Sequence, residues 1–381
     1  MKHLLSASLL ALSAALAAAP APAAAQSDIL LRLRSGSPLG DRFRVDSAGS
    51  VVAIGQLGIG IIPATGCGYR MMWYSFRGSF RAGSTDDGGA CTYWDDGSHG
   101  FYSWAGGNLT MASAYATFAF GDRTVASSSY AMAFGQQTEA TGAYALAHGY
   151  QSKCTGSYCL GYGYISNAAG QAAIAIGYRA TADADYSVAI GQRASTNGHP
   201  GSFVFADQST TDSVEASANN QFMSRFAGGY RLYTNATETV GVSLNAGGST
   251  WNVISDVNRK EHFLPVDGED LLSRIRSVPV TTWRYIDEEN RSVRHIGPMA
   301  QDWERAFGFS GDPTTINMGD FDGVNLAGVQ ALERRTAAQA AEIQTLRADL
   351  AAQREENAAL RGRLESLEAR LQRLEAAGRT P

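Results

Sequence analysis

Histidine, cysteine and positive charge are scarce in this 381-residue sequence, which holds six histidines and four cysteines and has a formal net charge of −5. So few ligand side chains, at such wide spacings, do not form the dense pattern of a metal site. We therefore expect no metal and no cofactor. Without a basic bias, no nucleic-acid partner is expected. Charged residues make up only 18% of the chain, which excludes a highly charged disordered protein.

Long apolar runs are absent after the N-terminus, so no membrane helix is predicted. The N-terminus has a basic start at Lys2, an apolar run over residues 4–18, and three alanines before Gln26. This order is typical of a signal peptide, and the run is too short for an anchor helix. We therefore expect residues 1–25 to be a signal peptide. The protein would be exported across the inner membrane and then secreted or held at the cell surface.

Export bears on the four cysteines, because disulfides form and persist in oxidising compartments. The disulfide candidates are Cys67, Cys91, Cys154 and Cys159. Their order in the chain suggests the pairs Cys67–Cys91 and Cys154–Cys159, although three connectivities are possible.

Glycine, in contrast, is abundant, and part of it recurs at a step of fourteen residues. The recurring glycines are Gly107, Gly121, Gly135, Gly149, Gly163, Gly177 and Gly191. Most are preceded by a phrase in which large and small side chains alternate, such as AMAFG and AIAIG. Alternation of period two indicates a strand with two different faces, and an even repeat restores the same face in every coil. The sequence therefore predicts a parallel β-roll or β-solenoid over residues 107–200.

We expect the large side chains to stack inside this roll and the small ones to let another chain approach closely. His148 occupies a large position and is expected to be packed or at an edge, not catalytic. Tyr130, Tyr144, Tyr158 and Tyr186 recur beside the phrases and are expected to stack. A coiled coil also has a period of fourteen, but a glycine in every repeat costs about 1 kcal/mol in a helix.

The phrases resemble the head repeats of trimeric autotransporter adhesins, which form a left-handed, trimeric β-roll. The resemblance implies a homotrimer, and an adhesin would bind a cell-surface glycan or protein receptor through the roll's exterior and residues 67–105. The resemblance stops at the head, so we expect no membrane insertion by the chain itself. Residues 26–106 are predicted to be an N-terminal β-rich region and residues 201–254 a β neck.

Four aspartates in the N-terminal region invite comparison with a calcium site. They are Asp86, Asp87, Asp95 and Asp96. Calcium takes six or more oxygens from a defined loop, and the local sequences DDGGA and DDGSH fit no such loop. We predict solvated turns at these positions.

The composition changes at Ile254, where charged residues become frequent and glycine becomes rarer. The motifs SDVNRKE, WRY, HIGPMAQD and DGVNLAGVQAL follow in that order over residues 254–335. They resemble the intramolecular chaperone auto-processing domain of phage tail spikes, endosialidases and related fibres, a family of self-cleaving Ser-Lys peptidases. The domain is predicted at residues 255–328.

This resemblance implies a cut between Ile254 and Ser255, with Ser255 as the nucleophile and Lys260 as its base. A serine hydroxyl attacks once a neighbouring base takes its proton. Cleavage of the chain's own bond requires no external substrate. The candidate supporting residues are His295, Asp256 and Arg259.

Each of these residues has a second interpretation. His295 could polarise the carbonyl or pack in a core, and Arg259 could favour a neutral lysine by its charge. Asp256 could orient Lys260 or, as we favour, cap the following turn. Ser255 could itself be a cap, and the domain could be a chaperone that does not cleave.

A heptad pattern over residues 329–376 predicts a coiled-coil helix. The a positions are Val329, Thr336, Ile343, Leu350, Asn357, Leu364 and Leu371, and the d positions are Leu332, Gln339, Leu346, Gln353, Leu360, Leu367 and Leu374. Thr336 with Gln339, and Gln353 with Asn357, form two polar layers. Heptads alone do not separate a dimer from a trimer, so the trimer rests on the two resemblances. The alternative is an amphipathic helix docked on its own domain.

The sequence thus predicts a mainly β protein. A trimeric roll would be followed by an α+β chaperone domain and a long parallel coiled coil. The favoured function is a fibre matured by autoproteolysis, and the alternatives are an adhesin with a non-cleaving chaperone or a glycan hydrolase. No carboxylate pair suited to glycoside hydrolysis is evident.

Overall fold

The computed structural model describes residues 29–35, 40–89, 91–309 and 311–377, and the predicted signal peptide lies outside them. The chain divides into two compact units. The first ends at Tyr230 and the second begins at Arg231, except that residues 244–249 belong to the first. Among the described residues, no helix combines the length and the hydropathy needed to span a bilayer.

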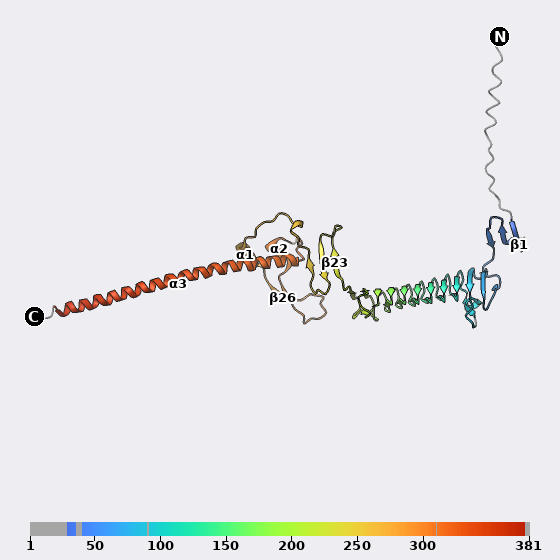
Figure 1. Cartoon of the computed structure of the whole chain (residues 1–381), viewed down its shortest axis with the longest axis horizontal. Helices are drawn as coiled ribbons and strands as arrows, with labels where there is room; N and C mark the ends of the chain where they lie inside the picture. Colours follow the sequence, from blue (N-terminus) through green and yellow to red (C-terminus); the bar gives the residue numbers. More distant parts are fainter. Residues whose placement is uncertain (1–28, 36–39, 90, 310, 378–381) are drawn as a thin grey trace, which may run out of the picture. The chain divides into compact units, whose positions relative to one another are not determined.

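A parallel β-roll forms most of the first unit and appears in Figure 1 as a ladder of short arrows. Each coil contributes one longer and one shorter strand, and strands of each kind stack in parallel on those of the next coil. The longer strands are β6 Trp104–Asn108, β8 Phe118–Asp122, β10 Met132–Gln136, β12 Leu146–Tyr150, β14 Leu160–Tyr164, β16 Ile174–Tyr178, β18 Val188–Gln192, β20 Phe203–Ala206 and β22 Phe222–Arg225. The shorter strands are β7 Met111–Ala112, β9 Val125–Ala126, β11 Glu139–Ala140, β13 Lys153–Cys154, β15 Asn167–Ala168, β17 Thr181–Ala182, β19 Ala194–Ser195 and β21 Val214–Glu215. The predicted solenoid is confirmed.

The interior of the roll contradicts the predicted orientation of the two faces. Small residues fill it: Ala133 and Ala147 are fully buried, whereas Met132 is 41% exposed and Phe134 is partly exposed. Two short facing strands in a coil of fourteen residues leave room only for alanine, serine, threonine and cysteine side chains. The large side chains therefore point outward, where they are available to another chain.

Left-handed backbone at fixed positions lets each coil turn within fourteen residues. Gly135 has φ +115°, and a Cβ built there would overlap the carbonyl oxygen of Gly149 in the next coil. Gln137 and Tyr130 also have positive φ, at 56° and 62°. Glycine is required at position 135 because the left-handed backbone there and the neighbouring backbone of Gly149 both exclude a side chain.

The predicted tyrosine stack exists on the outside of the roll, but it is shorter than expected. The rings of Tyr130 and Tyr144 are 4.7 Å apart, and those of Tyr144 and Tyr158 are 5.1 Å apart. Ala172 takes the equivalent position in the following coil, so Tyr186 lies outside the stack. His148 is exposed and stacks on Tyr162, with ring centres 4.8 Å apart.

The strands before the roll are antiparallel, but the parallel ladder begins earlier than the glycine repeat. These strands are β1 Ile29–Ser35, β2 Gly40–Asp46, β3 Val51–Ala53, β4 Tyr69–Tyr74 and β5 Ser79–Ser84. Strand β5 pairs in parallel with β6, and Gly83 aligns with Gly107 across a longer connection. On β4, Met72 and Tyr74 are buried while Met71 and Trp73 are exposed, so only one face of this strand belongs to the core.

Large polar side chains close the interior of the first coils. The Arg81 guanidinium is fully buried and donates to the carbonyl oxygens of Ser103 and Ala112, each at 2.9 Å. The His99 ring lies between the Ser79 hydroxyl at 2.9 Å and the carbonyl oxygen of Trp94 at 3.0 Å. These partners satisfy both ring nitrogens of His99 and both terminal nitrogens of Arg81, as burial away from water requires.

The roll is followed by a three-stranded sheet and then by the helical part of the chain. The sheet contains β23 Gly229–Tyr233, β24 Gly241–Asn245 and β25 Asn252–Val253. After the turn η3 Val257–Arg259 come α1 Gly268–Ser277, β26 Thr281–Trp283, β27 His295–Gly297, α2 Ala300–Phe307 and α3 Met318–Ala377. The strands β23 and β24 lie within the segment predicted to be a β neck.

A small core holds α1, α2 and the start of α3 together. It consists of Leu271, Trp303, Phe307 and Val324, with partly buried residues around them. Beyond this core α3 continues as one uninterrupted helix, seen at the C-terminal end in Figure 1. Its heptad residues are exposed in the single chain, among them Ile343 and Leu374.

Candidate active site

The bond between Ile254 and Ser255 follows the last strand of the three-stranded sheet. Val253 on β25 pairs with Val242 on β24, and the Ile254 amide donates to the Gly241 carbonyl at 3.5 Å. The Ile254 side chain is 38% exposed. The candidate scissile bond is therefore anchored on its N-terminal side by the sheet and is open to solvent.

Ser255 and Lys260 are brought together by one short turn. The residues between them form the 3₁₀ turn η3, and the Lys260 Nζ lies 2.6 Å from the Ser255 Oγ. Asp256 is the N-cap of this turn, with its Oδ1 accepting from the Asn258 amide at 2.9 Å. The hydrogen bonds from Asn258 hold the pKa of the Asp256 carboxyl below its usual range. The structure thus gives Asp256 the capping position, where it shapes the turn that joins the pair.

Arg259 connects this turn to the loop between β23 and β24. Its guanidinium donates to the Thr239 carbonyl at 3.0 Å and lies 3.5 Å from the Asp256 carboxylate. Because Asp256 already pairs with the guanidinium, the charge available to favour a neutral lysine is reduced. Arg259 therefore acts here mainly by positioning the turn.

His295 is not brought to the Ser255–Lys260 pair. It lies on β27 opposite Trp283 of β26, with the two ring centres 4.8 Å apart. Its Nε2 is 3.3 Å from both carboxylate oxygens of Glu288, and the Tyr285 ring is 5.5 Å away. The WRY and HIGPMAQD motifs thus meet in a small aromatic cluster. This geometry favours a packing role for His295.

The Ser255–Lys260 geometry is that of a nucleophile beside a base. At 2.6 Å, with the Lys260 amine donating to the Ser255 oxygen, the two atoms are within the reach that proton transfer between a nucleophile and its base requires. Both side chains are exposed in the single chain. Because burial favours the neutral form of a lysine, the pair becomes a stronger candidate when another surface covers it.

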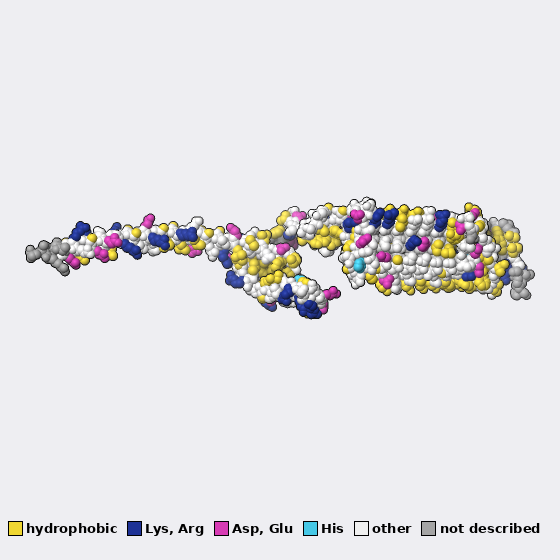
Figure 2. All heavy atoms as spheres, turned by 90° about the horizontal axis from the view of Figure 1, so that it is seen from below, with side chains coloured by type: hydrophobic (Ala, Val, Ile, Leu, Met, Phe, Trp, Pro, Cys, Tyr) yellow, Lys and Arg dark blue, Asp and Glu magenta, His cyan; other side chains and the backbone are white. Residues whose placement is uncertain are grey.

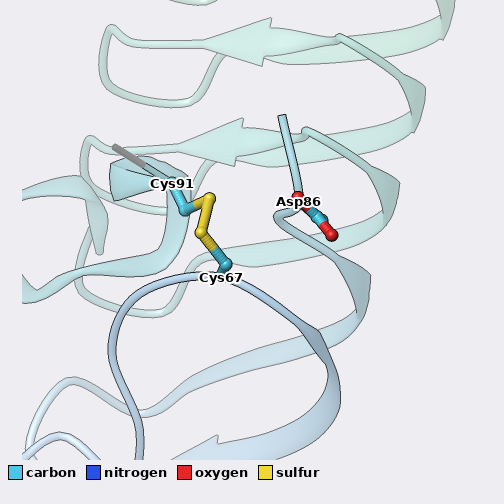
Figure 3. Close-up of side chains that lie close together, drawn as sticks. All are labelled: Cys67, Asp86 and Cys91. Atoms are coloured by element: carbon cyan, nitrogen blue, oxygen red, sulfur yellow. A yellow bond between two sulfur atoms is a disulfide. The ribbon is translucent and has the colours of Figure 1, made fainter. Parts of the chain in front are cut away.

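The cysteines form two disulfides within the described residues. The Cys67–Cys91 bridge lies beside Asp86 (Figure 3), so two sulfurs and a carboxylate come close together. Sulfurs that are bonded to each other are not thiolates, so this cluster has no metal-binding donor set. The second bridge joins Cys154 and Cys159 inside the roll, where other coils bury alanine, serine or threonine.

The aspartates near the first bridge serve as turn and anchor groups. Asp95 accepts from the Gly66 amide at 2.9 Å, and Asp96 accepts from the Tyr74 hydroxyl at 3.1 Å. Asp86 accepts from the amide of Gly88 two residues later. The contact of Asp86 is that of a turn, whereas those of Asp95 and Asp96 join segments that are distant in the sequence.

Two residues that shape the site have no sequence signal of their own. Thr239 is important only through its carbonyl oxygen, which any residue supplies, and it lies 20 residues before its partner Arg259. Glu288 sits in a turn between β26 and β27 and meets His295 because those strands pair. Their roles depend on the fold and not on local residue type.

Two family models match parts of the chain. Residues 255–311 match the family described as the chaperone of endosialidase, and that match begins at Ser255. Residues 126–152 and 168–194 match two copies of the YadA head domain repeat. No curated protein matches the chain. Both resemblances expected from the sequence are confirmed. Together they indicate an adhesin-like, homotrimeric fibre, at the surface or secreted, with an endosialidase-type chaperone segment.

Proposed function

We propose that this chain is an exported homotrimeric fibre whose C-terminal part assists folding of the trimer and then cuts itself off between Ile254 and Ser255. The observation that carries the proposal is the 2.6 Å contact between Lys260 Nζ and Ser255 Oγ, at the first residue of the chaperone match. We assign residues 255–328 to the chaperone segment and residues 329–376 to the trimerising helix.

The proposed reaction uses only groups of the chain and one water molecule. Neutral Lys260 takes the proton of the Ser255 hydroxyl, and the oxygen attacks the carbonyl carbon of Ile254. The C–N bond breaks, the amine of Ser255 receives the proton, and an ester joins Ile254 to the serine oxygen. Water then hydrolyses this ester and leaves a carboxylate on Ile254 and a free hydroxyl on Ser255.

Association of the chains would activate the Ser255–Lys260 pair. In the single chain Ser255 and Lys260 are both exposed to water. In a homotrimer, neighbouring copies would cover the turn and favour the neutral amine. We therefore propose that cleavage follows association of the chains.

The order of events explains why a fibre would carry a removable segment. A parallel roll forms by pairing strands that are fourteen or more residues apart, and three such chains must also find one another in the right register. A C-terminal coiled coil gathers the chains early and raises their effective concentration. Cleavage then releases the finished fibre.

The predicted N-terminal signal peptide supports export, and the head-repeat match supports a receptor-binding role on a cell surface. We propose a cell-surface glycan or protein as the receptor class. The outward-facing side chains of the roll that are not used between chains are the surface available for it.

The test is intact mass spectrometry of the purified full chain beside its Ser255→Ala and Lys260→Ala variants. We expect the wild type to appear as two pieces that meet between residues 254 and 255, and both variants to stay whole. Ser249→Ala, an exposed serine six residues upstream, is the control and should be cut normally. A folded wild type that stays whole would show that the segment is a chaperone without cleavage activity.

A further inference from the structure

The outer part of α3 has an apolar stripe that nothing covers in the single chain. Ile343, Leu346 and Leu364 along this stripe are 48%, 58% and 59% exposed, and Leu374 is 70% exposed. A helix that presents such a regular heptad seam is stable in water only when another helix packs on it. The stripe identifies an interaction surface, and the charges beside it indicate what covers it.

Charged residues between 336 and 375 are concentrated at the two positions that flank the seam. The e positions hold Arg347, Arg354, Arg361, Glu368 and Glu375, and the g positions hold Glu342, Asp349, Glu356, Arg363 and Arg370. The outer b, c and f positions of this stretch carry only three charged residues, Glu355, Glu365 and Arg373. Most of their other residues are alanine. Within this described stretch, no ion pair joins any of the ten flanking charges to another residue. Figure 2 shows both acidic and basic side chains along the helix.

In a parallel pair of helices in register, a g residue lies beside the e residue five positions later on the neighbouring chain. Applied to two copies of this helix, the rule gives five pairs, and all five are attractive. The pairs are Glu342–Arg347, Asp349–Arg354, Glu356–Arg361, Arg363–Glu368 and Arg370–Glu375. The first three have the acid at g, and the last two have the base at g.

This change of sign along the helix makes the pattern sensitive to register. If one copy slips by a heptad in one direction, Glu356 comes to lie beside Glu368. If it slips in the other direction, Arg363 comes to lie beside Arg361. Either slip replaces an attractive pair with a like-charged pair at each interface, and like charges in such positions are unfavourable. A helix with a single sign at g would not make this distinction.

We propose that α3 carries a sign-switched charge ladder whose partner is another copy of α3, aligned in parallel and in register. The inference rests on the proposed homotrimer, because the rotational symmetry of a closed trimer makes its helices parallel. It goes further in naming the residues that select the partner and set the register. The alternative is that the charges only keep an exposed helix soluble, and then their heptad position would not matter.

The first experiment measures association of the full chain by analytical ultracentrifugation, with Ser255→Ala in every protein compared, so that the proposed cleavage does not remove α3. The variant Arg363→Glu with Arg370→Glu makes every flanking charge of the last two heptads acidic. We expect its association to weaken by about tenfold or more, and the wild-type association to weaken in high salt. The matched control, Gln372→Glu with Arg373→Glu, adds acid at the outer b and c positions and should associate as the wild type does.

A restored variant guards against a simple failure to fold. Adding Glu368→Arg and Glu375→Arg to the first variant reverses both pairs, so that each g acid again faces an e base on the neighbour. We expect this fourfold variant to recover association. If the double variant associates as tightly as the wild type, or if the fourfold variant does not recover, the ladder does not select the partner.

The second experiment reads the register. A chain with Leu360→Cys and a chain with Leu367→Cys are produced together and oxidised. In-register helices join cysteines at the same position, whereas a one-heptad slip joins position 360 to position 367. We expect same-position products to dominate, and a comparable yield of mixed products would overturn the register claim. If the wild type does not associate at all, both this inference and the proposed homotrimer fail. An associating wild type that is indifferent to the charge changes contradicts the ladder alone.

Discussion

At the residue scale, the most unusual environment belongs to His99 and Arg81 in the first coils. Burial, and after it the nearby Arg81 charge, lowers the pKa of His99 to about 3. Burial also lowers the pKa of Arg81 to about 9. The Trp94 carbonyl and Asp96 act in the opposite direction on His99, and Arg77 acts in the same direction as Arg81. A neutral histidine is therefore built into the interior of this part of the roll.

Acid should weaken the fold through His99. In the unfolded chain this histidine takes up a proton near pH 6.5, whereas in the folded chain it stays neutral down to about pH 3. The free energy of unfolding is therefore at its full value above pH 6.5. Below that pH it falls by about 1.4 kcal/mol per pH unit, because only the unfolded chain binds the proton. Denaturant midpoints measured between neutral and mildly acidic pH should show this loss. His99→Gln should flatten it, and the exposed His262→Gln should leave it unchanged.

At the element scale, the coil of the roll is defined by its corners and its small interior. Gly149 has φ +116°, and a Cβ there would overlap the carbonyl oxygen of Gly163. The same relation joins each recurring glycine to the next along the roll. The corner therefore tolerates neither a side chain nor a shift of the adjacent coil.

Replacing one corner glycine should destabilise the roll. Gly149→Ala places a side chain in a left-handed corner and against backbone, and we expect a loss of about 1–3 kcal/mol. Thermal unfolding of the variant beside the wild type measures the effect. Gly97→Ala is the control, because Gly97 is exposed and has open space around its Cα. Equal unfolding temperatures for the two variants would show that the corner is not under this constraint.

The elements differ in how far the sequence could predict them. The fourteen-residue repeat and the heptads depend on local periodicity, so the roll and the long helix could be recognised. Which face of the strand lies inside could not, because AMAFG alternates equally well in either orientation and the width of the coil decides. The closeness of Ser255 and Lys260 needs only one turn and was foreseeable. The partners Thr239 and Glu288 depend on strand pairing, which no local pattern shows.

At the scale of the whole molecule, the large side chains outside the roll and the seam of α3 are both exposed in the single chain, as surfaces between copies would be. Figure 2 shows hydrophobic side chains gathered along the edges of the roll, with charges scattered on the face between them. An interior of alanine buries little apolar area per coil, so much of the stability of the fibre should come from contacts between chains. Folding and assembly are then one process.

If so, removing the C-terminal segment should make unfolding of the fibre hard to reverse. The fully cleaved wild type and the uncleaved Ser255→Ala variant would be unfolded in denaturant, separated from small solutes and returned to native buffer. We expect the variant to recover its trimer and the cleaved protein to recover far less, because its gathering helix is gone. Equal recovery would show that the segment is not needed for folding.

The constancy of the coil also bears on how the length of such a protein changes. Every coil from β8 to β18 offers the next one the same strand pairing, with glycine matched to glycine. After a duplication or deletion of fourteen residues, the strands of one coil would still pair with those of an equivalent coil. Neither new core residues nor a new cap would be needed. Each such event changes the roll by one strand spacing, about 4.8 Å. The length of the roll therefore changes by whole coils, and a single insertion of fourteen residues adds one coil.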